Sequence, residues 1–251
     1  MIPLEWRLKQ DLLTATSRVE NFPVFFKPEW GQNSHGIYRV DNTESFLKVN
    51  KALANSKIPY LLQEAARESR EFEIFYIRDT FQPDRYKTLT VTEVINKGSE
   101  RFPINGVLNC DSAYIDKTSA FTENQLQQIW RLIDRLGDFW ISRIGVKVNS
   151  EQELLQGNFH IVEINLFTPM PLNLLDTAIS FKKKHAFIRS SMEHLAQCCQ
   201  RASTRGSRES IFFRKLKMHQ QVKASPKLSA SEPVPEVPFK KSDDMMPISQ
   251  N

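Results

Sequence analysis

The sequence predicts an α+β fold, in which helices and strands interleave without a regular βαβ repeat. Several short segments alternate apolar and polar residues, which predicts strands. Residues 122–139 instead carry apolar side chains at helical spacing after a capping-box-like start at Thr122, and this pattern predicts the clearest helix. The 251 residues are enough for one large domain or two small ones.

The first half of the chain predicts two helices and five strands. Residues 4–17 place Leu4, Leu8 and Leu12 on one face of an amphipathic helix. Residues 43–56 predict a second helix, with Thr43 as its N-cap. The alternating or β-rich segments are 24–26, 36–40, 58–65, 70–78 and 86–96.

The second half predicts two more strands and a final helix. The strands are expected at 142–148 and 159–166, joined by a turn-rich segment. A proline-bearing loop, FTPMPLN, then leads to a helix that ends near Ala202. Residues 205–251 are first basic and then rich in Pro and Ser, which predicts a disordered tail.

The composition is that of a globular protein, with 40% hydrophobic and 25% charged residues. No stretch approaches the ~18 uninterrupted apolar residues of a membrane span. Charged residues interrupt the first positions, so we expect no signal peptide. The three cysteines form no disulfide or metal-binding pattern. Together these features predict a reduced, cytoplasmic setting, and the oligomeric state remains open.

The net charge of +5 comes from one segment. Residues 182–219 contain ten Lys and Arg against two Asp and Glu, whereas residues 1–181 contain 20 against 23. Such a segment can contact an acidic surface, and a solvent-facing helix is the simpler interpretation. No nucleic-acid-binding motif accompanies it, so we expect no specific nucleic-acid binding.

The stretch FFKPEWGQNSHGIYRV, residues 25–40, ends a strand at Lys27 and continues into a small-residue loop. Backbone N–H groups of such a loop can surround phosphate oxygens, and Lys27 would add a positive charge beside them. The same pattern also occurs in ordinary hairpins.

A second group of polar residues lies near the end of the predicted strands. Glu163 and Asn165 are two apart on one strand, so their side chains face the same side. A carboxylate and an amide oxygen are hard ligands suited to Mg²⁺ that carries nucleotide phosphates. Arg143, on the preceding strand, has the charge to stabilise a transferring phosphoryl group.

In this order, PVFFKPEWGQNSHGIYRV, YLLQEAARESREFEIFYIR, SRIGVKV and IVEIN resemble the motifs of the ATP-grasp superfamily over about residues 20–180. The resemblance implies two α+β subdomains that clasp ATP, at about 21–80 (a small lid) and 81–204, after an N-terminal helix within 1–20. The family's N-terminal domain is then short or absent.

The resemblance also assigns roles to individual residues. Lys27 resembles the lysine on the α- and β-phosphates, residues 31–36 the loop that closes on them, and 63–66 the hinge that reads adenine. Within these segments and just after them, the implied nucleotide-binding residues are Lys27, Gly31, Ser34, Gly36, Gln63, Glu64, Ala66 and Glu71. The last resembles the ribose-binding acid, and Gln63 and Glu64 both fit the place of the hinge acid. Arg143 is implied as the catalytic residue, and Glu163 and Asn165 as ligands of Mg²⁺ or Mn²⁺.

One departure bears on activity. The family has an aspartate two residues after the arginine, whereas this chain has Gly145. Loss of one carboxylate ligand would weaken Mg²⁺ binding. Asp116, Asp138 or Glu93 are candidates to replace it, and Gly145→Asp is expected to raise turnover. A second departure is the loop FTPMPLN, which implies an acceptor pocket of its own.

Two main functions follow from the resemblance. The first is an ATP-dependent ligase that joins a small-molecule carboxylate to an amine or thiol through an acyl phosphate. The second is a catalytically impaired pseudoenzyme or nucleotide-binding interaction module. A third interpretation makes the basic tail the functional part of a peripheral protein.

Overall fold

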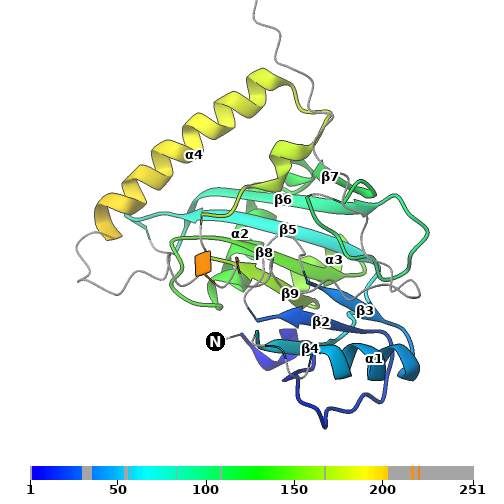
Figure 1. Cartoon of the computed structure of the whole chain (residues 1–251). Coiled ribbons are helices and arrows are strands. Elements are labelled where there is room, and N and C mark those ends of the chain that lie inside the picture. Colours follow the sequence, from blue (N-terminus) through cyan, green and yellow to red (C-terminus); the bar gives the residue numbers. More distant parts are fainter. Residues whose placement is uncertain are drawn as a thin grey trace, which may run out of the picture.

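The computed structural model describes residues 2–29, 36–53, 56, 58–82, 84–107, 109–166 and 168–202, together with 216, 217 and 220. These residues form two antiparallel sheets and several helices, which confirms the predicted α+β architecture. The four-stranded sheet and α1 lie below the five-stranded sheet in the view of Figure 1. Most of the remaining helices accompany the larger sheet.

The smaller sheet has the strand order β1–β4–β2–β3. Its strands are β1 (Gln10–Leu12), β2 (Val24–Pro28), β3 (Tyr38–Val40) and β4 (Tyr60–Glu64). One face packs on α1 (Thr43–Leu53) through Val24, Phe26, Phe46 and Val49. Because side chains alternate along a strand, Phe25 and Lys27 lie on the opposite face of β2.

The larger sheet has the order β7–β6–β5–β8–β9. Its strands are β5 (Arg70–Arg78), β6 (Tyr86–Asn96), β7 (Ser112–Asp116), β8 (Ile141–Val148) and β9 (His160–Asn165). The sequence predicted the first two and the last two of these, and β7 was missed. Residues 70–78, which the sequence analysis grouped with the small lid, form the central strand of this sheet.

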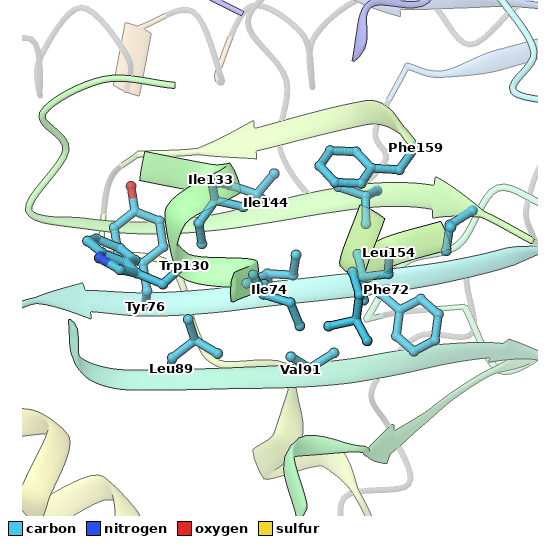
Figure 2. Close-up of a cluster of buried hydrophobic side chains, with 14 of the residues drawn as sticks. Phe72, Ile74, Tyr76, Leu89, Val91, Trp130, Ile133, Ile144, Leu154 and Phe159 are labelled. Atoms are coloured by element: carbon cyan, nitrogen blue, oxygen red, sulfur yellow. The ribbon is translucent and has the colours of Figure 1, made fainter. Parts of the chain in front are cut away.

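One face of the larger sheet is covered by α2 (Glu123–Asp134) and α3 (Glu151–Gln156). The buried side chains between them are shown in Figure 2 and include Phe72, Ile74, Tyr76, Val91, Trp130, Ile133, Ile144 and Leu154. The predicted capping box of α2 is confirmed, since Thr122 Oγ1 accepts from the Gln125 amide and the Gln125 side chain accepts from the Thr122 amide. Phe72, Ile74 and Ile144 therefore point toward the helices. Glu73, Arg143 and Gly145 lie on the opposite face of the sheet.

Two local predictions were wrong. Residues 4–17 form no α-helix but the 3-10 turn η1 (Leu4–Trp6) and the edge strand β1. The expected apolar face does not pack, since Leu4 is 78% and Leu12 57% exposed, whereas Trp6 is buried in the large core and stacks on Phe159. Burial of one large aromatic side chain outweighs the weak preference of a short helix.

The segment 149–158, expected to be turn-rich, contains the short helix α3, with Ser150 as N-cap and Gly157 as a left-handed C-cap (φ +79°). In addition, α1 begins one residue earlier than expected, because the Asn42 side chain accepts a hydrogen bond from the Ser45 amide. Asn42 rather than Thr43 therefore caps α1.

The final helix α4 (Phe181–Ala202) ends where the sequence predicted. It packs on β5 through Phe187, Leu195 and Cys198, and its N-terminal end extends away from the sheets in Figure 1. Almost all of the predicted disordered tail lies outside the described residues. Within the described residues, no helix has the length and apolar character needed to cross a membrane. Contact of the basic segment with an acidic surface, and the cytoplasmic setting, stay predictions.

Candidate functional site

Lys27 lies on the face of the small sheet that is turned toward the large sheet. Its Nζ donates a 2.6 Å hydrogen bond to Gln63 Oε1 on the adjacent β4, and Gln63 Nε2 donates to Gln10 Oε1 at 2.9 Å. The ammonium group also lies 5.7 Å from the ring centre of Phe25. The small sheet therefore presents the positive charge of Lys27, which a row of polar side chains holds in place.

The electrostatic surroundings of Lys27 come from the other sheet. Burial lowers the pKa of Lys27, the negative charges of Glu163 and Glu71 raise it in part, and the positive charge of Lys147 lowers it. These three residues belong to β9, β5 and β8 of the large sheet. Lys27 and Glu163 therefore face a common region between the sheets rather than two separate surfaces.

A row of paired residues crosses the large sheet on the face turned to Lys27. In strand order it contains Asp116, Thr92, Glu73, Gly145 and Glu163, each opposite the next. Directly opposite residues on neighbouring strands point to the same face. A kink in β9 at this point, where the register shifts between Gly145 and Val146, sets Glu163 beside Gly145.

Arg143 joins two acids of this row, Glu73 and Glu163. Its Nε donates to Glu73 Oε2 at 3.0 Å, and its Nη2 donates to Glu163 Oε1 at 3.1 Å. Glu163 Oε1 also accepts from Asn165 Nδ2 at 2.8 Å. The expectation that the polar pair on β9 needs a partner is thus met by Arg143, which the sequence placed on the neighbouring strand.

Glu71 lies two residues before Glu73 on β5, on the same face of the sheet, and has two partners. Its Oε2 accepts from Lys147 Nζ at 2.8 Å and from Asn105 Nδ2 at 2.8 Å. Asn105 belongs to the connection between β6 and β7, which therefore folds over this part of the sheet. The same connection contacts the small sheet, where Arg39 donates to the Glu100 carboxylate at 2.7 Å.

The predicted hinge residues separate into two directions. Gln63 turns toward Lys27, whereas Glu64 forms a 3.7 Å ion pair with Lys9. Ala65 and Ala66 are buried at the point where the chain leaves the small sheet. Of the two candidates for the hinge acid, only Gln63 shares the face of Lys27. Its amide side chain can form hydrogen bonds with a nucleotide but carries no charge.

Gly31 and Ser34 lie outside the described residues, so the predicted phosphate loop is known only at its end. Gly36 is described and has φ +73°, a left-handed conformation that favours glycine. It precedes β3, which pairs with β2 beside Lys27. The loop thus leaves from the strand of Lys27 and returns next to it.

Of the three acids considered as replacements at position 145, Asp116 alone belongs to the row of paired residues. Glu93 is opposite Phe72 on the helix-covered face and pairs with Arg70 at 2.7 Å. Asp116 is at the far end of the row, where its Oδ1 accepts from the Thr118 amide. Asp138 lies in the connection between α2 and β8, outside the sheet. The alternation of side chains on strands explains the error for Glu93.

Sequence reasoning missed Glu73 and Lys147, although a signal was present. Each lies two residues after a residue of interest, Glu71 or Gly145, and period-two alternation puts it on the same face. Tyr114 was also missed; burial, followed by the charges of Glu73 and Glu71, raises its pKa, so it faces the same region from β7. Asn105 had no sequence signal, because its position depends on how a long connection folds.

The loop that follows Asn165 is fixed at both ends. Arg143 Nη1 donates to the Met170 carbonyl at 3.0 Å, and Asp176 Oδ2 accepts from the Asp116 amide at 2.9 Å. Between them, η3 (Leu172–Leu175) packs on Val94 and Tyr114 through Leu172. This loop therefore borders the charged row and differs in its prolines from the small-residue loop of the family pattern.

The donor set fits a hard divalent cation in chemical terms. Among the described residues, no group of three or more His, Cys, Asp or Glu side chains is arranged to hold a metal. Mg²⁺ in nucleotide sites commonly takes one or two carboxylates and completes its shell with phosphate oxygens and water. Glu163 and Asn165, two residues apart on β9, provide a carboxylate and an amide oxygen of the kind that Mg²⁺ binds.

No protein-family model and no curated protein matches the chain. Solved structures do resemble it. L-amino acid ligase from Bacillus licheniformis has 14% identity and a TM-score of 0.43, over 64% of this chain and 36% of that one. D-alanine–D-alanine ligase from Bacillus anthracis has 12% identity and a TM-score of 0.49, over 78% and 62%.

Carboxyaminoimidazole ribonucleotide synthase from Aspergillus clavatus, in complex with ATP, has 11% identity and a TM-score of 0.42, over 63% of this chain and 40% of that one. These are ATP-grasp enzymes, the family that the sequence motifs resemble. The chain spans less than two thirds of the length of each. At these levels of similarity, the function has to be argued from the site itself.

Proposed function

We propose that this chain binds ATP with Mg²⁺ or Mn²⁺ and acts as an ATP-dependent carboxylate–amine or carboxylate–thiol ligase. One observation carries the proposal: Lys27 on the small sheet and Arg143, Glu163 and Asn165 on the large sheet face one region between two β-layers. A triphosphate needs positive charge at intervals along its length, and an acid–amide pair for the cation that accompanies it.

Each residue then has a task set by its charge. Lys27 pairs with the α- and β-phosphates, with help from the loop that holds Gly31, Ser34 and Gly36. The hinge around Gln63, Glu64 and Ala66 offers backbone groups to adenine. Glu71 accepts hydrogen bonds from ribose hydroxyls, in place of the one it now receives from Asn105.

Glu163 and Asn165 would hold the divalent cation, which supplies charge neutralisation at the phosphates when it is bound. Arg143 stabilises charge on the phosphoryl group as it is transferred. Its present partners, Glu73 and Glu163, keep the guanidinium in a fixed orientation beside the proposed ligands. A fixed charge needs no reorganisation during the reaction, which is the main contribution a protein makes to phosphoryl transfer.

The chemistry has two steps. An oxygen of the substrate carboxylate attacks the γ-phosphorus of ATP, the bond to the ADP oxygen breaks, and an acyl phosphate forms. The amine or thiol then attacks the acyl carbon and phosphate leaves with the electron pair of the broken C–O bond. The nucleophile loses its proton to solvent or phosphate. Residues 168–171, after β9, would contact the acceptor.

A nucleotide-binding module without turnover is the second candidate. It is favoured by Gly145, which replaces an acid of the family pattern, and by the pairing of polar side chains with one another. Lys27 bonds to Gln63, and Glu71 to Lys147, so binding of a nucleotide requires these contacts to be exchanged. Such a module would bind ATP and form no acyl phosphate.

Two measurements separate these functions. Calorimetric titration with ATP and Mg²⁺ tests binding, and hydroxylamine trapping with a panel of amino acids and other carboxylates tests acyl phosphate formation. A ligase gives both signals, and the module gives binding alone. Absence of ATP binding by the full chain would contradict both candidates.

A further inference from the structure

Glu73 lies where a side chain at position 145 would be. A Cβ atom built on Gly145 would lie 2.7 Å from Glu73 Oε1 and 2.9 Å from Glu163 Cγ, closer than real Cβ atoms approach other atoms. The two residues are directly opposite on β5 and β8. The missing side chain at 145 therefore leaves a space that the Glu73 carboxylate fills.

We propose that Glu73 supplies the second carboxylate of the divalent-cation site, and that Gly145 is the glycine that gives it room. This proposal rests on the function proposed above. The carboxylate would have moved from one strand to its neighbour, so that the site keeps two acids although the strand of Arg143 carries none after it.

The lengths of the side chains permit this exchange. Neighbouring strands lie about 4.8 Å apart, and glutamate is one methylene longer than aspartate. A glutamate on β5 can therefore extend over a glycine on β8 and bring its carboxylate next to Glu163. An aspartate at 145 and a glutamate at 73 would compete for one space, so Gly145→Asp alone is now expected to disturb the site rather than to restore it.

The two oxygens of Glu73 have different surroundings. Oε2 accepts from Arg143 Nε at 3.0 Å, and Oε1 is the atom that lies nearest to the position of the absent Cβ. One oxygen therefore orients the arginine and the other is on the side of Glu163.

The neighbouring strand β6 places two buried hydroxyls, those of Thr90 and Thr92, on the same face of the sheet as Glu73. Thr92 is opposite Glu73 on β6, is 1% exposed, and its Oγ1 has no hydrogen-bond partner in the part of the chain that the structure describes. Buried hydroxyls are normally satisfied by a partner. Mg²⁺ usually retains several waters, and a water on a cation next to Glu73 would be such a partner.

The experiment measures Mn²⁺ binding to the full chain in the presence of ATP, from the electron paramagnetic resonance signal of free Mn²⁺. Glu73→Gln removes the charge and keeps an acceptor for Arg143. Glu93→Gln is the matched control, because it removes a buried acid from the opposite face of the same sheet. Glu163→Gln tests the acid already assigned to the site, and Gly145→Ala tests the space.

We expect Glu73→Gln to weaken Mn²⁺ binding at least tenfold, Gly145→Ala to weaken it severalfold, and Glu93→Gln to leave it within twofold. If Glu73→Gln fails to fold, Gly145→Ala decides the question. Wild-type Mn²⁺ affinity in both Glu73→Gln and Gly145→Ala would overturn the proposal. If Glu163→Gln alone weakens binding, the proposed function survives without Glu73. If the wild-type chain binds neither Mn²⁺ nor ATP, both fail.

Discussion

The two faces of the five-stranded sheet each bury a glutamate, and the comparison shows how the same residue type serves different ends. On the helix-covered face, burial would raise the pKa of Glu93, but Arg70 and Lys117 outweigh it and the pKa is lowered. On the opposite face, burial and the charge of Glu163 raise the pKa of Glu73 well above its usual range, and Arg143 offsets them only in part.

The opposite pKa shifts of Glu93 and Glu73 show on which face of the sheet the buried acid is stabilised by its partners. Glu93 forms ion pairs with two cations, Arg70 and Lys117. Glu73 and Glu163 share Arg143, and Glu73 is buried whereas the Glu163 side chain is 47% exposed. Because its pKa is raised, Glu73 takes up a proton more readily than an ordinary glutamate, whereas Glu93 keeps its negative charge. The helix face therefore holds a firmly paired carboxylate, and the other face holds an acid whose burial is only partly compensated.

The largest expected effect comes from the helix face. Trp130 is fully buried, meets the ring of Tyr76 edge-on at 5.1 Å and donates from Nε1 to the Asp84 carbonyl at 2.8 Å. Trp130→Ala should lower the free energy of unfolding by about 3–5 kcal/mol. Urea denaturation measures this change, and Phe181→Ala, at a side chain 84% exposed, is the control expected within about 0.5 kcal/mol of wild type. A small loss for Trp130→Ala would mean that the core repacks.

The next largest effect tests whether only one face of the five-stranded sheet contributes to activity. Arg143→Ala should lower the rate of hydroxylamine-trapped product about 100-fold, equivalent to about 2.7 kcal/mol of transition-state stabilisation. Arg70→Ala is the matched control, since Arg70 lies on the same sheet but pairs with Glu93 on the other face. It should lower stability and leave the rate per folded molecule unchanged. Equal losses of rate in both variants would contradict the division of the two faces.

A smaller effect is expected for Glu93→Gln, with a defined dependence on pH. Because the pKa of Glu93 is lowered in the folded state, its stabilisation is present above the ordinary glutamate pKa and is lost as pH falls through the folded value. We expect Glu93→Gln to lower the free energy of unfolding by about 2 kcal/mol at neutral pH. This is less than the cost of breaking a buried pair without other partners, because Arg70 keeps its second partner, Glu151, at 3.1 Å. Chemical denaturation between pH 7 and 3 should show the difference shrinking; a constant difference would argue against this charge pairing.

The smallest effect concerns the contribution of the four-stranded sheet to ATP binding. Lys27→Ala should weaken ATP binding by at least ~1.5 kcal/mol if the ammonium pairs with phosphate. Lys9→Ala removes a lysine that is 65% exposed and pairs with Glu64, so it should leave the ATP affinity unchanged. Calorimetric titration gives both values. Equal affinities for wild type and Lys27→Ala would remove Lys27 from the proposed site.

Much of the fold followed from local patterns. The long apolar periodicity of α2 and the alternation in β5, β6 and β8 were read correctly because burial on one face imposes a fixed period on the sequence. The N-terminal segment was misread, since the position of Trp6 depends on a contact with Gly157, whose carbonyl accepts from the indole Nε1 at 2.8 Å. No local pattern contains a partner 151 residues away.

For the site, the sequence indicated Lys27, Arg143, Glu163 and Asn165 from their order and spacing, and the structure brings these four to one region. It did not indicate the acid that accompanies them. Glu73 was not among the three acids considered, because a neighbour from another strand is recognised only when the register of the sheet is known. Glu73 is 72 residues from Gly145 along the chain, and the pairing of β5 with β8 makes them neighbours.

By itself, the sequence determined most of the strands and helices and the polar residues that interrupt them, since hydrophobic period and capping act over a few residues. Only the tertiary structure decided which buried glutamate pairs with which arginine or lysine. That choice depends on strand order, register and the direction of each side chain, and charge interactions between buried groups are set by distances across the sheet rather than along the chain.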